Sequence, residues 1–293
     1  MDGKPEAEIE ISTDLVRELL AEQCSDLSGA PLSCVASGWD NVIYRLGETM
    51  AMRLPRRALA ATLLGHEQRW LPLLAKQLPI AVPKPLRNGT PASAYPWPWS
   101  VVPWFEGSGA DQAPPDGAAV EQVAQFLESL HVEAPAEAPD NPVRGQSLSV
   151  HAERMKARVA RLESKNLRPA PSVLLAWEAG VAERLPTEKR WLHGDLHAQN
   201  ILVKDGRISA IIDWGDLTAG DVATDLAVTW SLFEQQEDRQ SFWELYRPDA
   251  ATLARAKAWA AYFGIVLIDA GAINSPRHAA QGKTLLRRLA EDL

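Results

Sequence analysis

The sequence is poor in cysteine, with only Cys24 and Cys34 among 293 residues. Two cysteines are too few for a cysteine-based metal site, and we expect both to remain free thiols. Long apolar runs are also missing, because the longest, residues 258–268, falls well short of the roughly 20 residues that span a membrane. The acidic N-terminus has no apolar stretch typical of a secretory signal. We therefore expect a cytoplasmic protein without a membrane partner.

The sequence also has no excess of basic over acidic residues. The chain carries 30 Lys and Arg against 38 Asp and Glu, a net charge of −8. Phosphate backbones bind to basic surfaces, so this balance argues against a nucleic-acid partner. Most of the acidic excess lies after residue 105, where 27 acids face 20 bases, and it would draw a cationic ligand there. A solvated acidic face is the plainer alternative.

What the sequence does contain is a change of pattern near residue 103. Before it, residues 42–46 and 49–54 read as two strands around a turn, followed by a helical stretch that we expect to break near Pro72. The proline-rich apolar segment 95–105 predicts an edge strand that runs into a connector. After residue 109, apolar residues recur at helical spacing in 119–132, 150–165, 172–185 and from 223 onwards.

One hairpin interrupts the helical part of the chain. Residues 201–204 and 207–212 read as strands around Asp205-Gly206, a pair that favours the positive φ of tight hairpin turns. Together the patterns predict an α+β fold of two lobes. The expected boundaries are a small N-terminal sheet lobe over 1–102, a hinge over 103–107 and a larger, mainly helical lobe over 108–293.

The segment His193-Gly-Asp-Leu-His-Ala-Gln-Asn200, with Ile211-Ile-Asp-Trp-Gly-Asp216 after it, carries the chemistry. Asp195, Asn200 and Asp213 have the spacing of a kinase catalytic loop, in which the first Asp receives a hydroxyl proton. The Asn and the second Asp of that loop hold magnesium, a cation that prefers hard oxygen ligands. The spacing therefore predicts a phosphoryl-transfer site with Mg²⁺.

With these two segments and Gly220-Asp-Val-Ala-Thr-Asp225-Leu-Ala, the chain resembles the aminoglycoside phosphotransferases of the protein-kinase-like fold over roughly residues 33–235. The resemblance implies that Asp195 is the catalytic base and that Asn200 and Asp213 are the magnesium ligands. It further implies that Asp216 and Glu234 face the ammonium groups of the acceptor.

The resemblance also assigns structural roles in the same region. His193 would brace the catalytic loop by packing and hydrogen bonding, and Asp225 would tie the following helix to that loop.

The N-terminal lobe would then hold ATP or GTP as co-substrate. The loop that begins at Ser37 stands where a loop covers the phosphates, although it lacks the pattern G-x-G-x-x-G. Arg53 replaces the strand lysine of kinases and keeps a permanent cation, so we expect it to contact the nucleotide and to pair with Glu67. At the hinge, the Pro103 carbonyl and the Phe105 amide are predicted to meet the base.

Two features of the residue pattern admit a second interpretation. His193, Asp195 and His197 alternate, so on a strand they would share a face and predict a zinc or manganese cluster of a hydrolase. That hypothesis leaves Asn200 and Asp213 unexplained. The tryptophans near the hinge would either line the nucleotide pocket or pack in the core; they are Trp97, Trp99 and Trp104.

The predicted function is transfer of a nucleotide γ-phosphate to a hydroxyl of a small cationic molecule, with an aminoglycoside antibiotic as the preferred acceptor. A macrolide or other small-alcohol kinase is the alternative, because the scaffold does not determine the acceptor. A non-catalytic nucleotide-binding module would fit the missing lysine and the single-glycine loop. The predicted partners are the small-molecule acceptor and a nucleoside triphosphate.

Overall fold

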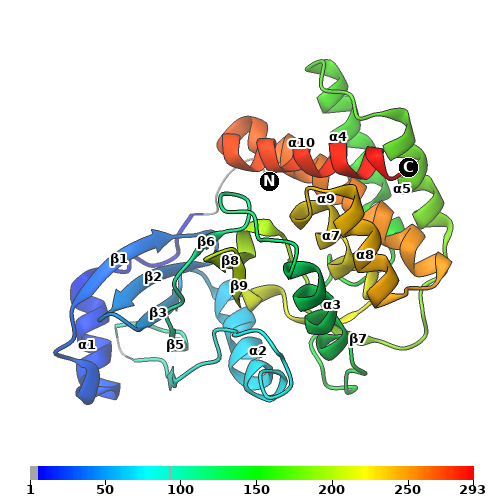
Figure 1. Cartoon of the computed structure of the whole chain (residues 1–293). Helices are drawn as coiled ribbons and strands as arrows, with labels where there is room; N and C mark the ends of the chain where they lie inside the picture. Colours follow the sequence, from blue (N-terminus) through cyan, green and yellow to red (C-terminus); the bar gives the residue numbers. More distant parts are fainter. Residues whose placement is uncertain (1–5, 93) are drawn as a thin grey trace. The chain divides into compact units, whose positions relative to one another are not determined.

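The computed structural model describes residues 6–92 and 94–293 (Figure 1). The chain forms two compact units. Among the described residues, the N-terminal unit contains residues 6–106 together with Ile211–Gly215, and the C-terminal unit contains Gly107–Ala210 and Asp216–Leu293. The first division falls inside the segment 103–107 that was expected to be a hinge. The return of residues 211–215 to the N-terminal unit was not predicted.

A five-stranded antiparallel sheet forms the base of the N-terminal unit. Its strands are β1 (Leu32–Ser37), β2 (Asn41–Leu46), β3 (Met50–Pro55), β4 (Arg87–Gly89) and β5 (Trp99–Pro103). They lie in the order β1-β2-β3-β5-β4. Exposure alternates along β2, whereas β3 is buried at every position after its first residue, as suits a strand in the middle of the sheet. The predicted hairpin of β2 and β3 is confirmed.

Two helices complete this unit. Helix α1 (Thr13–Gln23) begins where the Ser12 side chain accepts a hydrogen bond from the Leu15 amide at 3.2 Å. Its apolar side chains join a core with Tyr95 and Trp99 from the sheet side. Helix α2 (Ala58–Leu74) contains Pro72 and ends two residues later, so the predicted break lies at the end of the helix.

The prediction of an edge strand over 95–105 was wrong. Strand β5 lies between β3 and β4, and β1 and β4 are the edges. Proline is incompatible with a central strand only where it removes a ladder hydrogen bond. Here Pro96 and Pro98 precede β5 and Pro103 is its last residue, so the run between them pairs on both sides.

Helices make up most of the C-terminal unit. They are α3 (Ala119–Leu130), α4 (Ala152–Ser164), α5 (Pro171–Ala182), α6 (Ala223–Leu226), α7 (Val228–Leu232), α8 (Gln236–Tyr246), α9 (Ala250–Asn274) and α10 (Pro276–Glu291). Helix α9 packs against α5, α6 and α10. By length and composition Ala250–Gly271 would suffice to cross a membrane, yet 56% of its most apolar window is buried inside the protein. A core helix of a globular unit has the same properties.

Two small sheets carry the loop that contains the motif. Strand β6 (Ser108–Gly109) pairs with β8 (Ile201–Lys204), which neighbours β9 (Arg207–Ile211), and β7 (Arg190–Leu192) pairs with β10 (Thr218–Gly220). Asp205 and Gly206 have φ values of 52° and 77°. Positive φ at both turn residues confirms the predicted hairpin and its Asp-Gly turn.

The contact of α5 with α9 depends on a glycine. A Cβ at Gly180 would lie 2.3 Å from the Ala258 Cβ and 2.6 Å from the Ala254 carbonyl oxygen, whereas a Cβ at Gly65 in α2 would meet nothing within 4 Å. We expect Gly180→Ala to destabilise the protein by about 1–3 kcal/mol through overpacking. Gly65→Ala, the matched control, should stabilise α2 by up to about 1 kcal/mol. Urea unfolding midpoints measure both, and equal stability of the two variants would contradict this account.

Candidate active site

The turn that follows β7 is held by a buried carboxylate. Asp225 of α6 has no exposed surface and accepts hydrogen bonds from the His193 amide at 2.7 Å and the Gly194 amide at 2.9 Å. The ring of His131 approaches the same carboxylate, with Nε2 at 3.3 Å. A buried carboxylate is tolerated when such donors replace its water. The prediction that Asp225 ties its helix to the catalytic loop is confirmed.

Gly194 is required at this turn. Its φ is 86°, and a Cβ there would lie 2.3 Å from the Asp216 carbonyl oxygen. A side chain would therefore meet both backbone strain and a collision. His193 is fully buried, and its Nδ1 accepts a hydrogen bond from the Asp195 amide at 3.3 Å, which agrees with the bracing role predicted for it. The next side chain along the chain is Asp195.

Asp195 faces two cationic or donor groups. The Arg144 guanidinium donates from Nη2 to Oδ1 at 2.7 Å, and His197 Nε2 lies 3.5 Å from Oδ2. His197 Nδ1 accepts from the Gln199 amide at 3.2 Å, which places the ring proton of a neutral imidazole on Nε2. Burial alone would raise the pKa of Asp195, but Arg144 and His197 more than offset it and hold that pKa well below its usual range. The carboxylate is therefore ionised and able to accept a hydroxyl proton.

Asn200 ends the catalytic loop within η3 (Ala198–Asn200). Its Nδ2 donates to the Asp195 carbonyl oxygen at 2.9 Å, and the residue is 8% exposed. Because the amide nitrogen is engaged inside the loop, the carboxamide oxygen is the atom suited to a hard cation. The structure thus holds Asp195 and Asn200 together in the C-terminal unit.

A second buried ion pair lies in the N-terminal unit. Arg53 of β3 donates from Nη1 to both carboxylate oxygens of Glu67 of α2, at 2.5 Å and 2.7 Å, and both side chains are buried. Burial would lower the pKa of the Arg53 guanidinium, but Glu67 and Asp213 more than offset this and raise it. The predicted pairing is present, and contact of Arg53 with a nucleotide remains a prediction.

Asp213 belongs to the same unit as Arg53. Its Oδ1 lies 3.7 Å from Arg53 Nη2, and 60% of its side chain is exposed. The Ile211 amide donates to the Ala81 carbonyl at 2.9 Å, and the buried Trp214 ring donates to the Ile211 carbonyl at 3.0 Å. Between these anchors Asp213 adopts a left-handed φ of 63°. Such backbone is uncommon for a non-glycine residue and recurs at functional sites.

The donor set fits Mg²⁺, because a carboxylate and a carboxamide offer hard oxygen ligands. Asn200 and Asp213 belong to different units, so their convergence on one cation remains a prediction. The alternative of a His-Asp-His metal cluster gains no support. Within residues 6–92 and 94–293 no three His, Cys, Asp or Glu side chains are grouped to hold a metal.

The other predicted nucleotide contacts also lie in the N-terminal unit. Ser37 is the last residue of β1 and is exposed, and the loop after it is fastened by Arg56, which donates to the Gly38 carbonyl at 2.9 Å. Pro103 and Phe105 lie on the wall of a cavity of about 290 Å³, together with apolar residues between Leu78 and Val82. The contacts of Ser37, Pro103 and Phe105 with a nucleotide remain predictions.

The tryptophans near the hinge divide between core and surface. Trp99 has no exposed surface and lies in the core with α1, so it cannot line a nucleotide pocket. Trp97 packs partly buried against that core, and Trp104 carries the Arg45 guanidinium 4.6 Å from its ring centroid. For Trp99 the packing interpretation holds.

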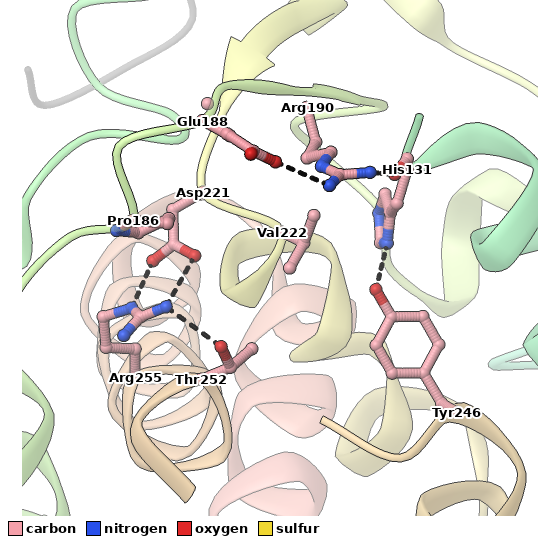
Figure 2. A pocket seen from close by; sticks show the side chains of 10 residues that line it. His131, Pro186, Glu188, Arg190, Asp221, Val222, Tyr246, Thr252 and Arg255 are labelled. Atoms are coloured by element: carbon pink, nitrogen blue, oxygen red, sulfur yellow. Dashed lines mark hydrogen bonds and ion pairs between the residues drawn. The ribbon is translucent and has the colours of Figure 1, made fainter. Parts of the chain in front are cut away.

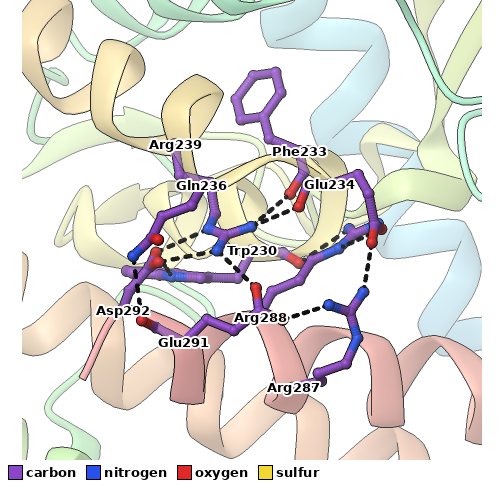
Figure 3. A network of polar contacts seen from close by, with 9 residues as sticks. All are labelled: Trp230, Phe233, Glu234, Gln236, Arg239, Arg287, Arg288, Glu291 and Asp292. Carbon is purple, nitrogen blue, oxygen red and sulfur yellow. Dashed lines mark hydrogen bonds and ion pairs between the residues drawn. The ribbon is translucent and has the colours of Figure 1, made fainter.

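The two predicted acceptor contacts have different surroundings. Asp216 accepts a hydrogen bond from Asn141 Nδ2 at 2.7 Å, close to the catalytic turn. Glu234 is ion-paired with Arg288 and with Arg287, the latter at 2.6 Å, within a network that joins α8 to the C-terminal end of α10 (Figure 3). These pairs, the Arg288 hydrogen bond first, lower the pKa of Glu234. Glu234 would have to exchange an arginine to bind an acceptor.

A cavity of about 260 Å³ is lined by residues of the C-terminal unit alone (Figure 2). Its charged lining groups pair with one another: Arg255 contacts Asp221 at 2.7 Å, and Arg190 contacts Glu188 at 2.8 Å. His131 Nδ1 lies 2.7 Å from the Tyr246 hydroxyl. The last of these contacts fixes the His131 ring, whose other nitrogen reaches Asp225.

Sequence reasoning missed Arg144, the group nearest to the Asp195 carboxylate. It lies 51 positions before Asp195, outside every motif. The turn residues Asp140-Asn141-Pro142 before it signal a loop. No pattern in a single sequence shows which side chain that loop presents.

The sequence pattern of the phosphotransferase enzyme family matches residues 32–261, and the chain belongs to this family. Over 210 residues it is 25% identical to the uncharacterized protein YcbJ of Bacillus subtilis (strain 168), covering 65% of each chain. Over 107 residues it is 28% identical to hygromycin-B 4-O-kinase of Escherichia coli, covering 35% of this chain and 30% of that one. The chain thus spans 65% and 30% of the lengths of these relatives.

Solved structures share the fold. The GDP complex of wild-type aminoglycoside 2'-phosphotransferase-IIIa matches with a TM-score of 0.69 at 17% identity, over 95% of this chain and 98% of that one. The macrolide 2'-phosphotransferase MphH from Brachybacterium faecium matches with a TM-score of 0.60 at 23% identity, over 93% and 98%. The predicted protein-kinase-like α+β fold is therefore confirmed.

The Arg53–Glu67 pair should be intolerant of losing one partner. Glu67→Gln leaves a buried guanidinium without its carboxylate, and we expect a loss of about 3–5 kcal/mol in the free energy of unfolding. The double variant Arg53→Met/Glu67→Met removes both charges and should recover much of that loss. Chemical denaturation of the three proteins measures the difference. Equal stability of E67Q and the wild type would contradict the burial argument.

His151 should make stability depend on pH. The ring is fully buried, stacks 4.4 Å from the Tyr262 ring, and donates from Nε2 to the Val143 carbonyl at 3.1 Å. Burial lowers its pKa to about 4 from the ordinary 6.5. Between pH 6.5 and 4 this histidine is protonated in the unfolded chain but stays neutral in the folded protein. The contribution of the neutral ring to the free energy of unfolding is therefore fully present above pH 6.5 and is lost as the pH falls from 6.5 to 4.

The expected loss across that pH window is about 3 kcal/mol. His151→Phe should flatten this part of the stability curve, measured by denaturation at several pH values. His66→Phe and His278→Phe, at rings that are only half-buried, serve as comparisons. An unchanged slope in H151F would contradict the assignment.

Proposed function

We propose that this protein transfers the γ-phosphate of ATP or GTP to a hydroxyl group of a small molecule, and that aminoglycosides are the acceptor class. The observation that carries the proposal is the built catalytic loop. Asp195 is ionised beside Arg144 and His197, and Asn200 is fastened to the same loop through the Asp195 carbonyl. A phosphoryl-transfer site needs this combination of an acceptor for the hydroxyl proton and an oxygen ligand for a cation.

Family membership and the shared fold support a phosphotransferase. Structures with this fold are described with GDP and with ATP, which supports a nucleoside triphosphate as co-substrate. The relatives include a kinase for hygromycin B, which supports an aminoglycoside acceptor. We assign Asp216, whose carboxylate accepts a hydrogen bond from Asn141 beside the catalytic turn, to an acceptor ammonium group.

In the proposed mechanism the acceptor hydroxyl attacks the γ-phosphorus in line with the leaving oxygen. Asp195 orients the hydroxyl and accepts its proton. Arg53, which is ion-paired with Glu67, contacts the phosphates. Asn200 and Asp213 would hold Mg²⁺, which neutralises charge on the triphosphate when bound. Because the pKa of Asp195 is low, its carboxylate acts by position more than by basicity, and proton transfer comes late.

Asp195→Asn tests the role of the carboxylate. The substitution keeps the shape of the side chain but removes its charge, so acceptor-dependent ADP or GDP release should fall about 10²–10⁴-fold. Nucleotide binding, measured by calorimetry, should persist. Asp205→Asn in the hairpin turn is the matched control, since Asn also tolerates the φ of 52° found there.

The assay is run against a panel of aminoglycosides, macrolides and simple amino alcohols with Mg²⁺. Full turnover by D195N would overturn the proposed mechanism. Phosphorylation of macrolides alone would overturn the acceptor class and leave the mechanism standing.

A further inference from the structure

The loop 141–146 of the C-terminal unit delivers a guanidinium to the catalytic carboxylate. Arg144 Nη2 donates to Asp195 Oδ1 at 2.7 Å. We infer that Arg144 is a positioning residue, which occupies Oδ1 and so presents Oδ2 of Asp195 to the acceptor hydroxyl. The inference rests on the proposed function, because it assigns a partner to the residue that receives the hydroxyl proton.

The backbone on the N-terminal side of Arg144 is fixed by Asn141. Its Oδ1 accepts from the Val143 amide at 2.9 Å and from the Arg144 amide at 3.2 Å, while its Nδ2 donates to Asp216. His151 adds a hydrogen bond to the Val143 carbonyl. One asparagine thus joins the segment that carries Arg144 to the carboxylate that follows β9.

The backbone on the C-terminal side is fixed by close packing. Gly145 has a φ of 65°, and a Cβ there would lie 2.7 Å from Leu192 Cδ1 and 3.0 Å from the Gly220 Cα. The Gly145 amide donates to Thr224 Oγ1 at 3.2 Å, and its carbonyl accepts from the Asp221 amide at 3.0 Å. The loop is therefore seated on β7 and β10, the strands that enclose the catalytic turn.

The guanidinium itself lies in a confined place. The Arg144 side chain is 20% exposed, and its central carbon lies 5.0 Å from the centroid of the Phe263 ring. Its Nε is buried and donates no hydrogen bond within the described part of the chain. Burying a cation in this way is costly unless a carboxylate compensates it. Asp195 is that carboxylate, and its rotamer is held by the interaction.

The two carboxylate oxygens of Asp195 have different surroundings and therefore different roles. Oδ1 is bound by Arg144, and Oδ2 lies 3.5 Å from His197 Nε2, with 30% of the carboxylate side chain exposed. An acceptor hydroxyl that reaches Oδ2 meets a carboxylate already fixed in direction, which is the condition for a reactive alignment. An acceptor ammonium group has to find another acid, because a guanidinium already neutralises this one.

A double-mutant cycle tests the inference. Arg144→Met should lower kcat about 10²-fold through misalignment, with KM for the nucleotide unchanged. Arg144→Lys keeps a cation without the planar fork and should recover part of the loss. In an Asp195→Asn background, Arg144→Met should reduce the residual rate no further, since a residue that acts through Asp195 has nothing left to position.

Losses that multiply in the double variant would overturn the inference, because they would show that Arg144 acts independently of Asp195. Wild-type kcat in R144M, or in R144K where R144M cannot be purified, would overturn it as well. Full turnover by D195N would instead overturn the role of Asp195 in the proposed mechanism, and no phosphate transfer by the wild type would overturn the proposed function, so these failures are distinguishable.

Arg158→Met is the matched control. Arg158 lies on α4 of the same unit, with its guanidinium 5.9 Å from the Tyr262 ring and 3.5 Å from Asp269, and within the described residues its ion pair is with Asp269 and not with the catalytic loop. It combines an aromatic ring with an acidic partner, as Arg144 does. We expect R158M to keep wild-type kcat. A loss equal to that of R144M would show that removing any such arginine perturbs the unit, and it would overturn the assignment.

Discussion

The candidate active site depends on a carboxylate that takes no part in the proposed chemistry. Asp225 is buried beneath the catalytic turn and binds two consecutive backbone amides. A turn of this kind cannot be stabilised by side-chain packing alone, since Gly194 has no side chain and its neighbours leave no room for one. The direction in which Asp195 leaves the turn follows from the position of Asp225, which α6 fixes.

Ion pairing explains why the acidic surplus is a poor guide to the acceptor. Asp221, Asp269, Glu234 and Glu291 each contact at least one arginine. Much of the negative charge of the C-terminal unit is therefore neutralised by arginines of the same unit. Composition gives only the number of acidic residues. Binding of a cationic acceptor depends on the carboxylates that are not already paired, and only the three-dimensional structure shows which these are.

The sequence was sufficient where local rules decide the structure. The Asp205-Gly206 hairpin, the helical C-terminal part and the spacing of Asp195 and Asn200 all follow from patterns of a few residues. It was insufficient where distant segments meet. Strand β5 reads as an edge because proline surrounds it, and only its pairing with β4 makes it internal.

The same limit applies to the site. Arg144 approaches Asp195 from 51 positions away, on a loop without regular structure, because Asn141 and Gly145 fix the backbone around it. Glu234 matched a family position, but Arg287 and Arg288 come from the far end of the chain. Neither relation leaves a local signal.

Residues 211–215 belong to the N-terminal unit, and this determines where the chain can be divided into fragments. This segment is synthesised after the catalytic loop, yet it is bonded to Ala81 and lies beside Arg53. A polypeptide severed after Glu106 would leave its first fragment without Asp213 and its second with a stretch that belongs elsewhere. The two compact units are therefore not consecutive halves of the sequence, and the N-terminal unit is complete only in a chain that continues to Gly215.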